Sequence, residues 1–275
     1  MKPLSEQTVL VTGSTAGHGR RLAELLAEEG ATVLIHGSDP AKGEAVRSEI
    51  ATQSGNESVR LYAADFSDLG QVRDMAARVQ EDCDTLECLV NNAGVGVAEP
   101  GGGERVESAD GAELRFQVNY LAHHLLTRLL LPLIQASAPS RIVNVSSAGQ
   151  ALIDFADPML VKRYDGHQAY CQSKLAQVME TIDLAAELDP AQVTVNALHP
   201  ATYMDTEMIR SAGIKPASSV DQGARATLRL VADPSLDGVS GLYFDHEHES
   251  VAHSQAYDDD ARRSLADLST RLTGA

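Results

Sequence analysis

Short runs of aliphatic and β-branched residues alternate along the chain with longer segments in which apolar residues recur at helical spacing. The runs predict strands at Gln7–Thr12, Ala31–Gly37, Val59–Asp65, Leu86–Gly94, Ser140–Ser147, Gln192–Pro200 and Gly241–Asp245. The periodic segments predict helices at Arg20–Gly30, Pro40–Thr52, Asp68–Gln80, Gly111–Gln135 and Gln168–Leu188. Strands that are apolar almost throughout are typical of a parallel sheet with helices on both faces. The pattern therefore predicts an α/β fold, a doubly wound parallel sheet of about seven strands.

The composition agrees with a single domain over residues 1–275. The chain has 275 residues without a compositional break, which is within the range of one large α/β domain. Hydrophobic residues make up 43% of the sequence, aromatic residues only 4%, and tryptophan is absent. We therefore expect a core built mainly from Ala, Val, Leu and Ile, as is usual for buried parallel strands.

The charge of the chain excludes several classes of partner. It carries 39 acidic and 22 basic side chains, a formal net charge of −17. Nucleic acids and anionic membranes bind basic surfaces, so neither is an expected partner. Cys83, Cys88 and Cys171 form neither a disulfide framework nor a paired metal motif, and the N-terminal MKPLSEQ has no apolar signal region. These features predict a cytoplasmic protein in a reducing compartment.

A glycine-rich turn, TGSTAGHG, joins the first predicted strand to the first helix. Gly13, Gly17 and Gly19 would let the backbone approach a pyrophosphate, and a helix N-terminus favours an anion. The alternative is a tight turn that needs a positive φ angle. The position of the turn in an α/β chain favours a Rossmann-like dinucleotide site at the carboxyl ends of the strands.

Polar residues follow other predicted strands. Asp65 follows the third strand, Asn91 and Asn92 of NNAG end the fourth, and Ser146 and Ser147 end the fifth. Asn91 and Asn92 would either fix the local backbone or contact an adenosine ribose. The next helix carries Tyr170 and Lys174, whose spacing puts both on one face. By itself this spacing is far more typical of an ordinary helix surface than of a catalytic pair.

The motifs TGxxxGxG, NNAG, Asn119, VNVSS and YxxSK occur in the order and at the spacings of the short-chain dehydrogenase/reductase family. The resemblance covers about residues 7 to 245. The segments GAELRFQVNYLAHHLL, AYCQSKLAQVMET and GLYFD most resemble the retinol-dehydrogenase-like branch, which includes the oxidoreductase domain of a WW-domain protein. The resemblance implies hydride transfer between a nicotinamide, NAD(P)(H), and an alcohol or carbonyl carbon.

The resemblance also implies catalytic roles. Tyr170 would be the acid/base, and Lys174 would lower its pKa and bind the nicotinamide ribose. Ser147, the second serine of its pair, would hold the substrate oxygen, while Ser146 would make a strand-end hydrogen bond. Asn119 would hold a water that links Lys174 to solvent.

A larger set of residues would contact the cofactor by the same resemblance. They are Gly13, Ser14, Gly17, His18, Gly19, Gly37, Ser38, Asp65, Phe66, Asn92, Ala93, Gly94, Tyr170, Lys174, Pro200 and Thr202. Thr206 is the alternative to Thr202. At the end of the second strand, Gly37 replaces the acid that would select NAD, and Ser38 stands where relatives often have Arg. Without the repelling carboxylate, a slight preference for NADP(H) is expected, although Asp39 lies nearby.

Three features depart from the family pattern or stand outside it. His18 replaces an aliphatic residue, and packing or solvent contact is favoured over a phosphate contact. Ala201 follows HP where the family usually has Gly. The segment DHEHES, Asp245–Ser250, has His246 and His248 at alternating positions, but we expect a solvated loop and no metal site.

The leading functional hypothesis is an NAD(P)-dependent alcohol dehydrogenase or carbonyl reductase with a small-molecule alcohol or ketone as substrate. The alternative from another class is a catalytically silent dinucleotide-binding regulator or scaffold. An epimerase or dehydratase of a nucleotide sugar would need a larger C-terminal substrate domain. Insertions near residues 151–167 and 203–217 are predicted to line the substrate pocket.

The predicted helix Gly111–Gln135 is apolar on more than one stripe, through Leu121, Leu125, Leu126, Leu129, Leu130 and Leu133. A wide apolar face indicates a partner. Family relatives often pair this helix and the Gln168–Leu188 helix across a two-fold axis, so a homodimer or tetramer is expected. The alternative is that Ala151–His167 folds over this face within one chain.

Overall fold

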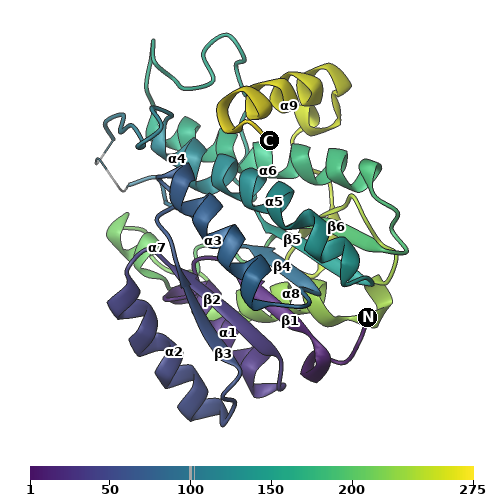
Figure 1. Cartoon of the computed structure of the whole chain (residues 1–275). Helices are drawn as coiled ribbons and strands as arrows, with labels where there is room; N and C mark the ends of the chain where they lie inside the picture. The colour runs from purple at the N-terminus through teal and green to yellow at the C-terminus, as the bar shows by residue number, and fades with distance from the viewer. Residues whose placement is uncertain (99–100, 102) are drawn as a thin grey trace.

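A computed structural model describes residues 1–98, 101 and 103–275. Its centre is an eight-stranded sheet in the order β3-β2-β1-β4-β5-β6-β7-β8 (Figure 1). The strands are β1 (Thr8–Val11), β2 (Thr32–Gly37), β3 (Val59–Ala63), β4 (Cys88–Asn91), β5 (Ser140–Val145), β6 (Val193–His199), β7 (Tyr243–Asp245) and β8 (His248–Ser250). The seven predicted strands are therefore confirmed. The eighth strand, which was not predicted, folds the segment expected to be a solvated loop into a hairpin.

Strands β1 to β7 pair in parallel, whereas β7 and β8 are antiparallel. The chain order reverses at β1, whose Val9 lies between Val33 of β2 and Cys88 of β4. In a doubly wound sheet this switch point opens a crevice at the carboxyl ends of the strands. The glycine-rich turn after β1 and the NNAG segment after β4 both lie at this edge.

Helices cover both faces of the sheet, with α1, α2 and α8 on one face and α3, α5 and α6 on the other (Figure 1). The helices are α1 (Gly17–Glu28), α2 (Pro40–Ser54), α3 (Leu69–Asp82), α4 (Leu114–Phe116), α5 (Ala122–Ala136), α6 (Gly166–Glu187), α7 (Glu207–Ser211), α8 (Val220–Ala232) and α9 (Asp259–Thr273). Short 3₁₀ turns lie at Leu4–Glu6, Pro234–Leu236 and Ser254–Tyr257. The core between these layers is mainly aliphatic, as the composition predicts.

The predicted helix Gly111–Gln135 is not one regular helix. A π-helical turn, η2 (Gln117–Leu121), separates α4 from α5 and contains Asn119. Single π turns within α-helices widen the backbone and occur frequently at functional sites. Asn has a low propensity for regular α-helix, and its position in this π turn explains why Asn119 lies within an otherwise apolar helical segment.

The leucines of this segment pack against other parts of the same chain. The wide apolar face is therefore not evidence for a partner subunit, contrary to the sequence-based interpretation. Leu121, Leu125, Leu126 and Leu130 are fully buried, and the other two pack partly buried against the same core. Helix α9 lies across α6 (Figure 1). Its Leu265 and Leu268 are buried in the same hydrophobic cluster as Leu175 and Met179 of α6. The homodimer or tetramer stays a prediction without that support, and light scattering of the full chain tests it.

Segment 151–167 also packs against the start of this helix, as the alternative account expected in part. Ile153 is buried, and Phe155 and Met159 lie partly buried against the cluster that contains Phe116 and Tyr120. The contact between α6 and α9 also includes an ion pair between Arg262 Nε and Asp183 Oδ1 at 2.6 Å.

In the described part of the chain, none of the helices has the length and apolar character of a membrane span.

Candidate active site

The turn after β1 forms a cradle that has no room for side chains. Gly13 has a φ of 63°, and a Cβ atom added there would lie 2.7 Å from the Cα atom of Ala93. A Cβ atom added at Gly19 would lie 2.4 Å from Asn92 Nδ2 and 2.5 Å from the Gly13 carbonyl oxygen. Both positions must therefore be glycine, without a side chain, for the turn and the NNAG segment to come into contact. The sequence-predicted residues Gly13, Gly19, Asn92 and Ala93 are brought together here.

The N-terminus of α1 differs from those of the other long helices that follow loops. No side chain of the described residues caps α1, whereas side-chain oxygens cap α2, α3, α6, α8 and α9. The first amide groups of a helix are hydrogen-bond donors without helical partners, and the helix dipole favours an anion there. The bare cradle and the uncapped helix fit a pyrophosphate.

Three residues that sequence reasoning missed hold the cradle in place. His36 Nδ1 accepts the Gly13 amide at 2.9 Å, and Thr12 Oγ1 accepts the amides of Asn92 and Ala93 at 2.8 and 2.9 Å. His123 Nε2 lies 3.1 Å from the same hydroxyl. Thr12 was the last residue of a predicted strand, but nothing in the local sequence indicates its partners 80 residues away.

His18 joins the cradle to α8. Asn92 Nδ2 donates to the carbonyl oxygens of Thr12 and Gly13, so Asn92 Oδ1 is left to accept from His18 Nδ1 at 2.7 Å. His18 Nε2 lies 3.0 Å from Thr227 Oγ1. Burial lowers the pKa of His18, so the imidazole is neutral near pH 7. The side chain packs in the interior, as expected, and its ring also positions the glycine-rich turn.

Replacing His18 by leucine should lower the free energy of unfolding by about 1–3 kcal/mol, because Asn92 and Thr227 would lose a buried partner. Dinucleotide binding should weaken with it, because Asn92 braces Gly13. Urea unfolding and NADPH titration measure the two effects. The double variant His18→Leu/Thr227→Val should recover part of the stability, since paired polar groups can be replaced together with little cost. An unchanged midpoint in His18→Leu would contradict a positioning role.

The region expected to contact the adenosine ribose lies at the ends of β2 and β3. Gly37 is buried at the end of β2, Ser38 is exposed, and Asp39 caps α2 by accepting the Ala41 and Lys42 amides. Asp65 is exposed after β3, where its carboxylate accepts the Ser67 amide at 2.9 Å. Asp39, the carboxylate that follows Ser38 in the sequence, is thus engaged with the N-terminus of α2.

Two further predicted cofactor residues are buried supports. Ser14 Oγ donates to the Val11 carbonyl oxygen at 2.7 Å and accepts the His36 amide at 2.9 Å. The Phe66 ring stacks on the His36 imidazole with 4.2 Å between centroids. Asn91 is also structural, because its amide nitrogen donates to Thr127 Oγ1 and to Asn144 Oδ1 between β4 and β5.

Ser147 and Tyr170 meet at the end of β5. Ser147 Oγ accepts the Gly149 amide at 3.0 Å, and a Cβ atom added at Gly149 would lie 3.4 Å from Ser147 Oγ and 3.9 Å from Tyr170 Cε1. The Ser147 carbonyl oxygen accepts the Tyr243 hydroxyl at 3.0 Å, so both ends of the residue are fixed. Ser146 Oγ instead donates to the Lys174 carbonyl oxygen at 2.7 Å, which is the structural role expected for it.

Burial raises the pKa of Tyr170, because a phenolate is disfavoured away from water, and the hydrogen bond from Ser147 offsets part of this. The lowering that the sequence led us to expect is therefore not met in the chain alone. Burial also lowers the pKa of the Lys174 amine to about 7, which weakens the ammonium charge expected to stabilise a phenolate.

Lys174 is enclosed beside Tyr170. Its Nζ atom lies 5.9 Å from the Tyr170 ring centroid and donates to the Val145 carbonyl oxygen at 2.9 Å and to Gln177 Oε1 at 3.0 Å. A Cβ atom added at Gly94 would lie 3.7 Å from Nζ, so NNAG reaches this point. Gln177 is a further residue that the motif search missed.

Asn119 contacts the same region from η2. Its Oδ1 atom accepts the Val95 amide at 2.8 Å, and its Nδ2 atom donates to Ser173 Oγ at 3.0 Å. His123 Nδ1 lies 2.9 Å from the Asn119 carbonyl oxygen, and burial lowers the pKa of His123 to about 3. A neutral imidazole that donates from Nδ1 therefore occupies one acceptor site of the Asn119 carbonyl oxygen. The relay through Asn119 stays a prediction.

Pro200 and the two candidate threonines occupy different places after β6. Pro200 is buried, and the exposed Thr202 has its hydroxyl 3.1 Å from His199 Nε2. A Cβ atom added at Gly17 would lie 3.1 Å from Thr206 Cγ2. Thr206, rather than Thr202, therefore packs against the glycine-rich turn.

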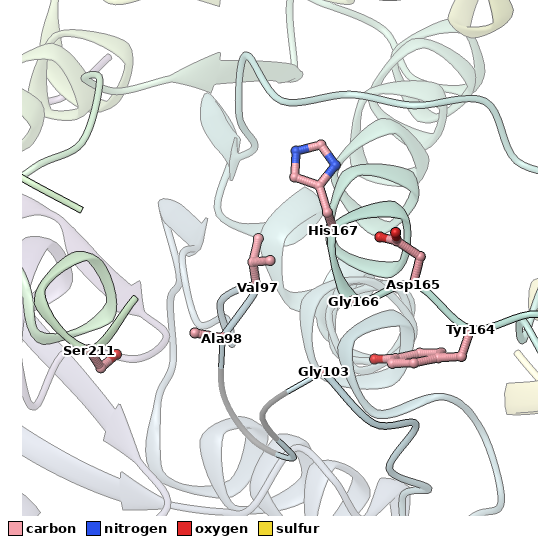
Figure 2. A pocket seen from close by; sticks show the side chains of 8 residues that line it. All are labelled: Val97, Ala98, Gly103, Tyr164, Asp165, Gly166, His167 and Ser211. Carbon is pink, nitrogen blue, oxygen red and sulfur yellow. The ribbon is translucent and has the colours of Figure 1, made fainter. Parts of the chain in front are cut away.

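A cavity of about 640 Å³ opens beside this site. It lies between the segment after β4, the start of α6 and helix α7 (Figure 2), and its lining residues are Val97, Ala98, Gly103, Tyr164, Asp165, Gly166, His167 and Ser211. His167 lies one helical turn before Tyr170. Both predicted loops, 151–167 and 203–217, thus contribute to the cavity.

Comparison with known proteins agrees with this geometry. Residues 7–216 match the model of the short chain dehydrogenase family. The chain belongs to the short-chain dehydrogenase family. It is 37% identical to mouse retinol dehydrogenase 13, with 98% of this chain and 84% of that protein covered. It is 36% identical to mouse polyprenol dehydrogenase, with coverage of 100% and 86%. The resemblance to the retinol-dehydrogenase-like branch is confirmed.

Solved structures of this family share the fold. A protein from Mycobacterium paratuberculosis has a TM-score of 0.78 at 29% identity and covers 98% of this chain and 94% of its own. A 3-ketoacyl-(acyl-carrier-protein) reductase from Brucella melitensis, complexed with NADH, has a TM-score of 0.66 at 26% identity, with coverage of 88% and 97%. A short chain dehydrogenase from Escherichia coli, complexed with NADPH, has a TM-score of 0.71 at 26% identity and the same coverage. Family membership and these complexes support an NAD(P)-dependent oxidoreductase.

Proposed function

We propose that the protein transfers a hydride between the nicotinamide of NAD(P)(H) and an alcohol or carbonyl carbon, with Tyr170 as the acid/base. The observation that carries this proposal is that Ser147, Tyr170 and Lys174 lie together next to the bare glycine cradle. A dinucleotide bound with its pyrophosphate at α1 would supply the hydride chemistry. The residues of the chain would position the substrate and handle the proton.

Each side chain has one task in this mechanism. The Ser147 hydroxyl, fixed by the Gly149 amide, would hydrogen-bond the substrate oxygen beside the phenol. In carbonyl reduction the Tyr170 hydroxyl would give its proton to that oxygen, and in alcohol oxidation the phenolate would take it back. The Lys174 ammonium would stabilise the phenolate, and its contacts with Val145 and Gln177 keep it in place.

The substrate class that we propose is an alcohol or aldehyde with a long apolar part. In the described part of the chain seven large hydrophobic side chains are exposed, and five of them lie on the two cavity loops. These five are Leu152, Val161, Tyr203, Met208 and Ile214. An apolar ligand that spans the mouth of the cavity would cover them. The names of the relatives, retinol and polyprenol dehydrogenases, agree with such a substrate.

A panel of alcohols and aldehydes of increasing chain length, followed by nicotinamide absorbance with each cofactor, tests the proposal. We expect kcat/KM to rise with apolar chain length, because each buried methylene contributes about 0.8 kcal/mol. Activity confined to short polar substrates would contradict the substrate class. Dinucleotide binding without turnover of any compound would favour the alternative, a catalytically silent regulator.

We further propose a slight preference for NADP(H), since Asp39 is committed to capping α2 and Gly37 stands at the end of β2 in place of an acidic residue. Replacing Ser38 by arginine should raise the NADPH/NADH affinity ratio at least about tenfold, through a charge-assisted contact with the 2′-phosphate. Titration of both cofactors measures the ratio. Ser48→Arg makes the same change on the exposed side of α2 and should leave the ratio near its starting value. Equal ratios in both variants would mean that Ser38 does not adjoin the ribose.

A further inference from the structure

The edge of the sheet beyond β6 brings a row of histidines and a carboxylate together. His199 of β6 pairs with Asp245 of β7, and Asp245 pairs with His248 of β8. Laterally paired residues direct their side chains to the same face of a sheet. Tyr243, two residues before Asp245, lies on this face and donates to the Ser147 carbonyl oxygen. The row therefore lies on the face that carries the catalytic site.

The potential ligand atoms lie close to one another. One atom each of His199, Asp245 and His246 lies within 4.8 Å of the others. Asp245 Oδ1 is 3.3 Å from His246 Nδ1, and the rings of His199 and His246 are 5.3 Å apart. Asp245 Oδ1 is shielded from solvent and makes no hydrogen bond to the described residues. The ion pair with His246 leaves lone pairs on this oxygen that a cation can use.

We propose that His199, Asp245 and His246 bind a divalent transition-metal ion of the zinc type. Two imidazoles and a carboxylate are ligands that zinc accepts, and bonds of about 2.1 Å in tetrahedral geometry place ligand atoms about 3.4 Å apart. The exposed His246, at the turn of the β7–β8 hairpin, can move to close this distance. His248, next to Asp245 across the hairpin, or water supplies the fourth ligand. The net charge of −17 also concentrates cations near the surface.

Occupation of this site has a consequence for the neighbouring turn. His199 Nε2 is 3.1 Å from Thr202 Oγ1, and Pro200 lies between them in sequence. A metal bound through Nε2 would release this hydroxyl, and one bound through Nδ1 would fix the ring that holds it. The ion would thus act on the turn after β6 and alter dinucleotide affinity.

Zinc titration of the full chain, dialysed first against a chelator, tests the site by calorimetry. We expect one saturable site and the same stoichiometry with Co²⁺, read from its visible absorption. His246→Gly removes an imidazole and suits the φ of 57° at this position, so it should weaken binding at least about tenfold without unfolding the chain. Asp245→Asn keeps the shape and should weaken binding similarly.

Glu249→Ala is the matched control, because Glu249 pairs with Phe244, whose side chain lies in the core on the opposite face. It should bind zinc as the parent chain does. The absence of saturable binding, or equal affinity in the parent and both ligand variants, would overturn the site and leave only an Asp245–His246 ion pair. These readouts do not depend on enzyme activity.

Discussion

Replacing Tyr170 by phenylalanine should lower turnover at least about a hundredfold while dinucleotide binding stays nearly unchanged. In the proposed mechanism the phenol exchanges a proton with a substrate oxygen held by Ser147, and a positioned acid/base typically contributes about 10²–10⁴-fold. The substitution keeps the ring, which is partly buried in α6, so the packing is preserved. Steady-state kinetics with the best substrate of the panel, together with NADPH titration, measures both quantities.

Tyr62→Phe provides the matched control for this experiment. Tyr62 lies on β3, and its hydroxyl donates to Asp82 Oδ2 at 3.0 Å, away from the cavity. Its removal should reduce stability by about 1 kcal/mol, the usual net contribution of one hydrogen bond, and leave turnover within a few-fold. If Tyr170→Phe behaved like this control, Tyr170 would not be the acid/base.

The sheet and the order of the motifs could be predicted because both depend on short stretches of consecutive residues. Buried parallel strands require continuous apolar runs, and a glycine-rich turn between a strand and a helix limits what can bind there. The structure brings Gly13, Asn92, Ser147, Tyr170 and Lys174 to one edge because parallel strands share a carboxyl end. The order of the strands and motifs, together with the family resemblance, was therefore enough to expect these residues at one edge of the sheet.

What the sequence did not reveal depends on contacts between distant segments. Thr12 and His123 brace the cradle across 111 positions, and His18 reaches Thr227 across 209. No periodicity encodes such pairs. The apolar width of the Gly111–Gln135 segment was interpreted as a sign of a partner because the pattern cannot tell a subunit from another helix of the same chain. Packing inside the chain and helix α9 account for it.

The short hairpin β7–β8 was not predicted for a related reason. Strand β8 has only the residues His248–Ser250, all polar, so it lacks the apolar run that predicts a strand. His246 and His248 were expected on one side of an extended segment, but His246 lies in the turn with a φ of 57°. Pairing with β7, rather than side-chain pattern, forms this strand.

Replacing Lys174 by methionine should lower turnover by about 10²–10³-fold, the scale for losing one charged group that stabilises a developing anion. Methionine fills a similar volume in the enclosed site and removes the amine. A phenolate at Tyr170 would attract the ammonium, and the ammonium would favour the phenolate, so the two groups titrate as a coupled pair. Dinucleotide binding should weaken as well, because the amine is the group expected to hold the nicotinamide ribose.

The double variant Tyr170→Phe/Lys174→Met decides whether the two residues form one unit. If Lys174 acts through the phenol, removing it after the phenol is gone should cost far less than about 10²-fold in turnover. The remaining loss should then appear in cofactor affinity alone.

The pH dependence of cofactor affinity separates the roles of the two residues further. Burial sets the pKa of Lys174 at about 7, so in the cofactor-free chain the ammonium is lost as the pH rises through 7. Cofactor affinity of the parent chain should fall over that range and that of Lys174→Met should not. Additive losses in turnover would show that Lys174 acts independently of Tyr170.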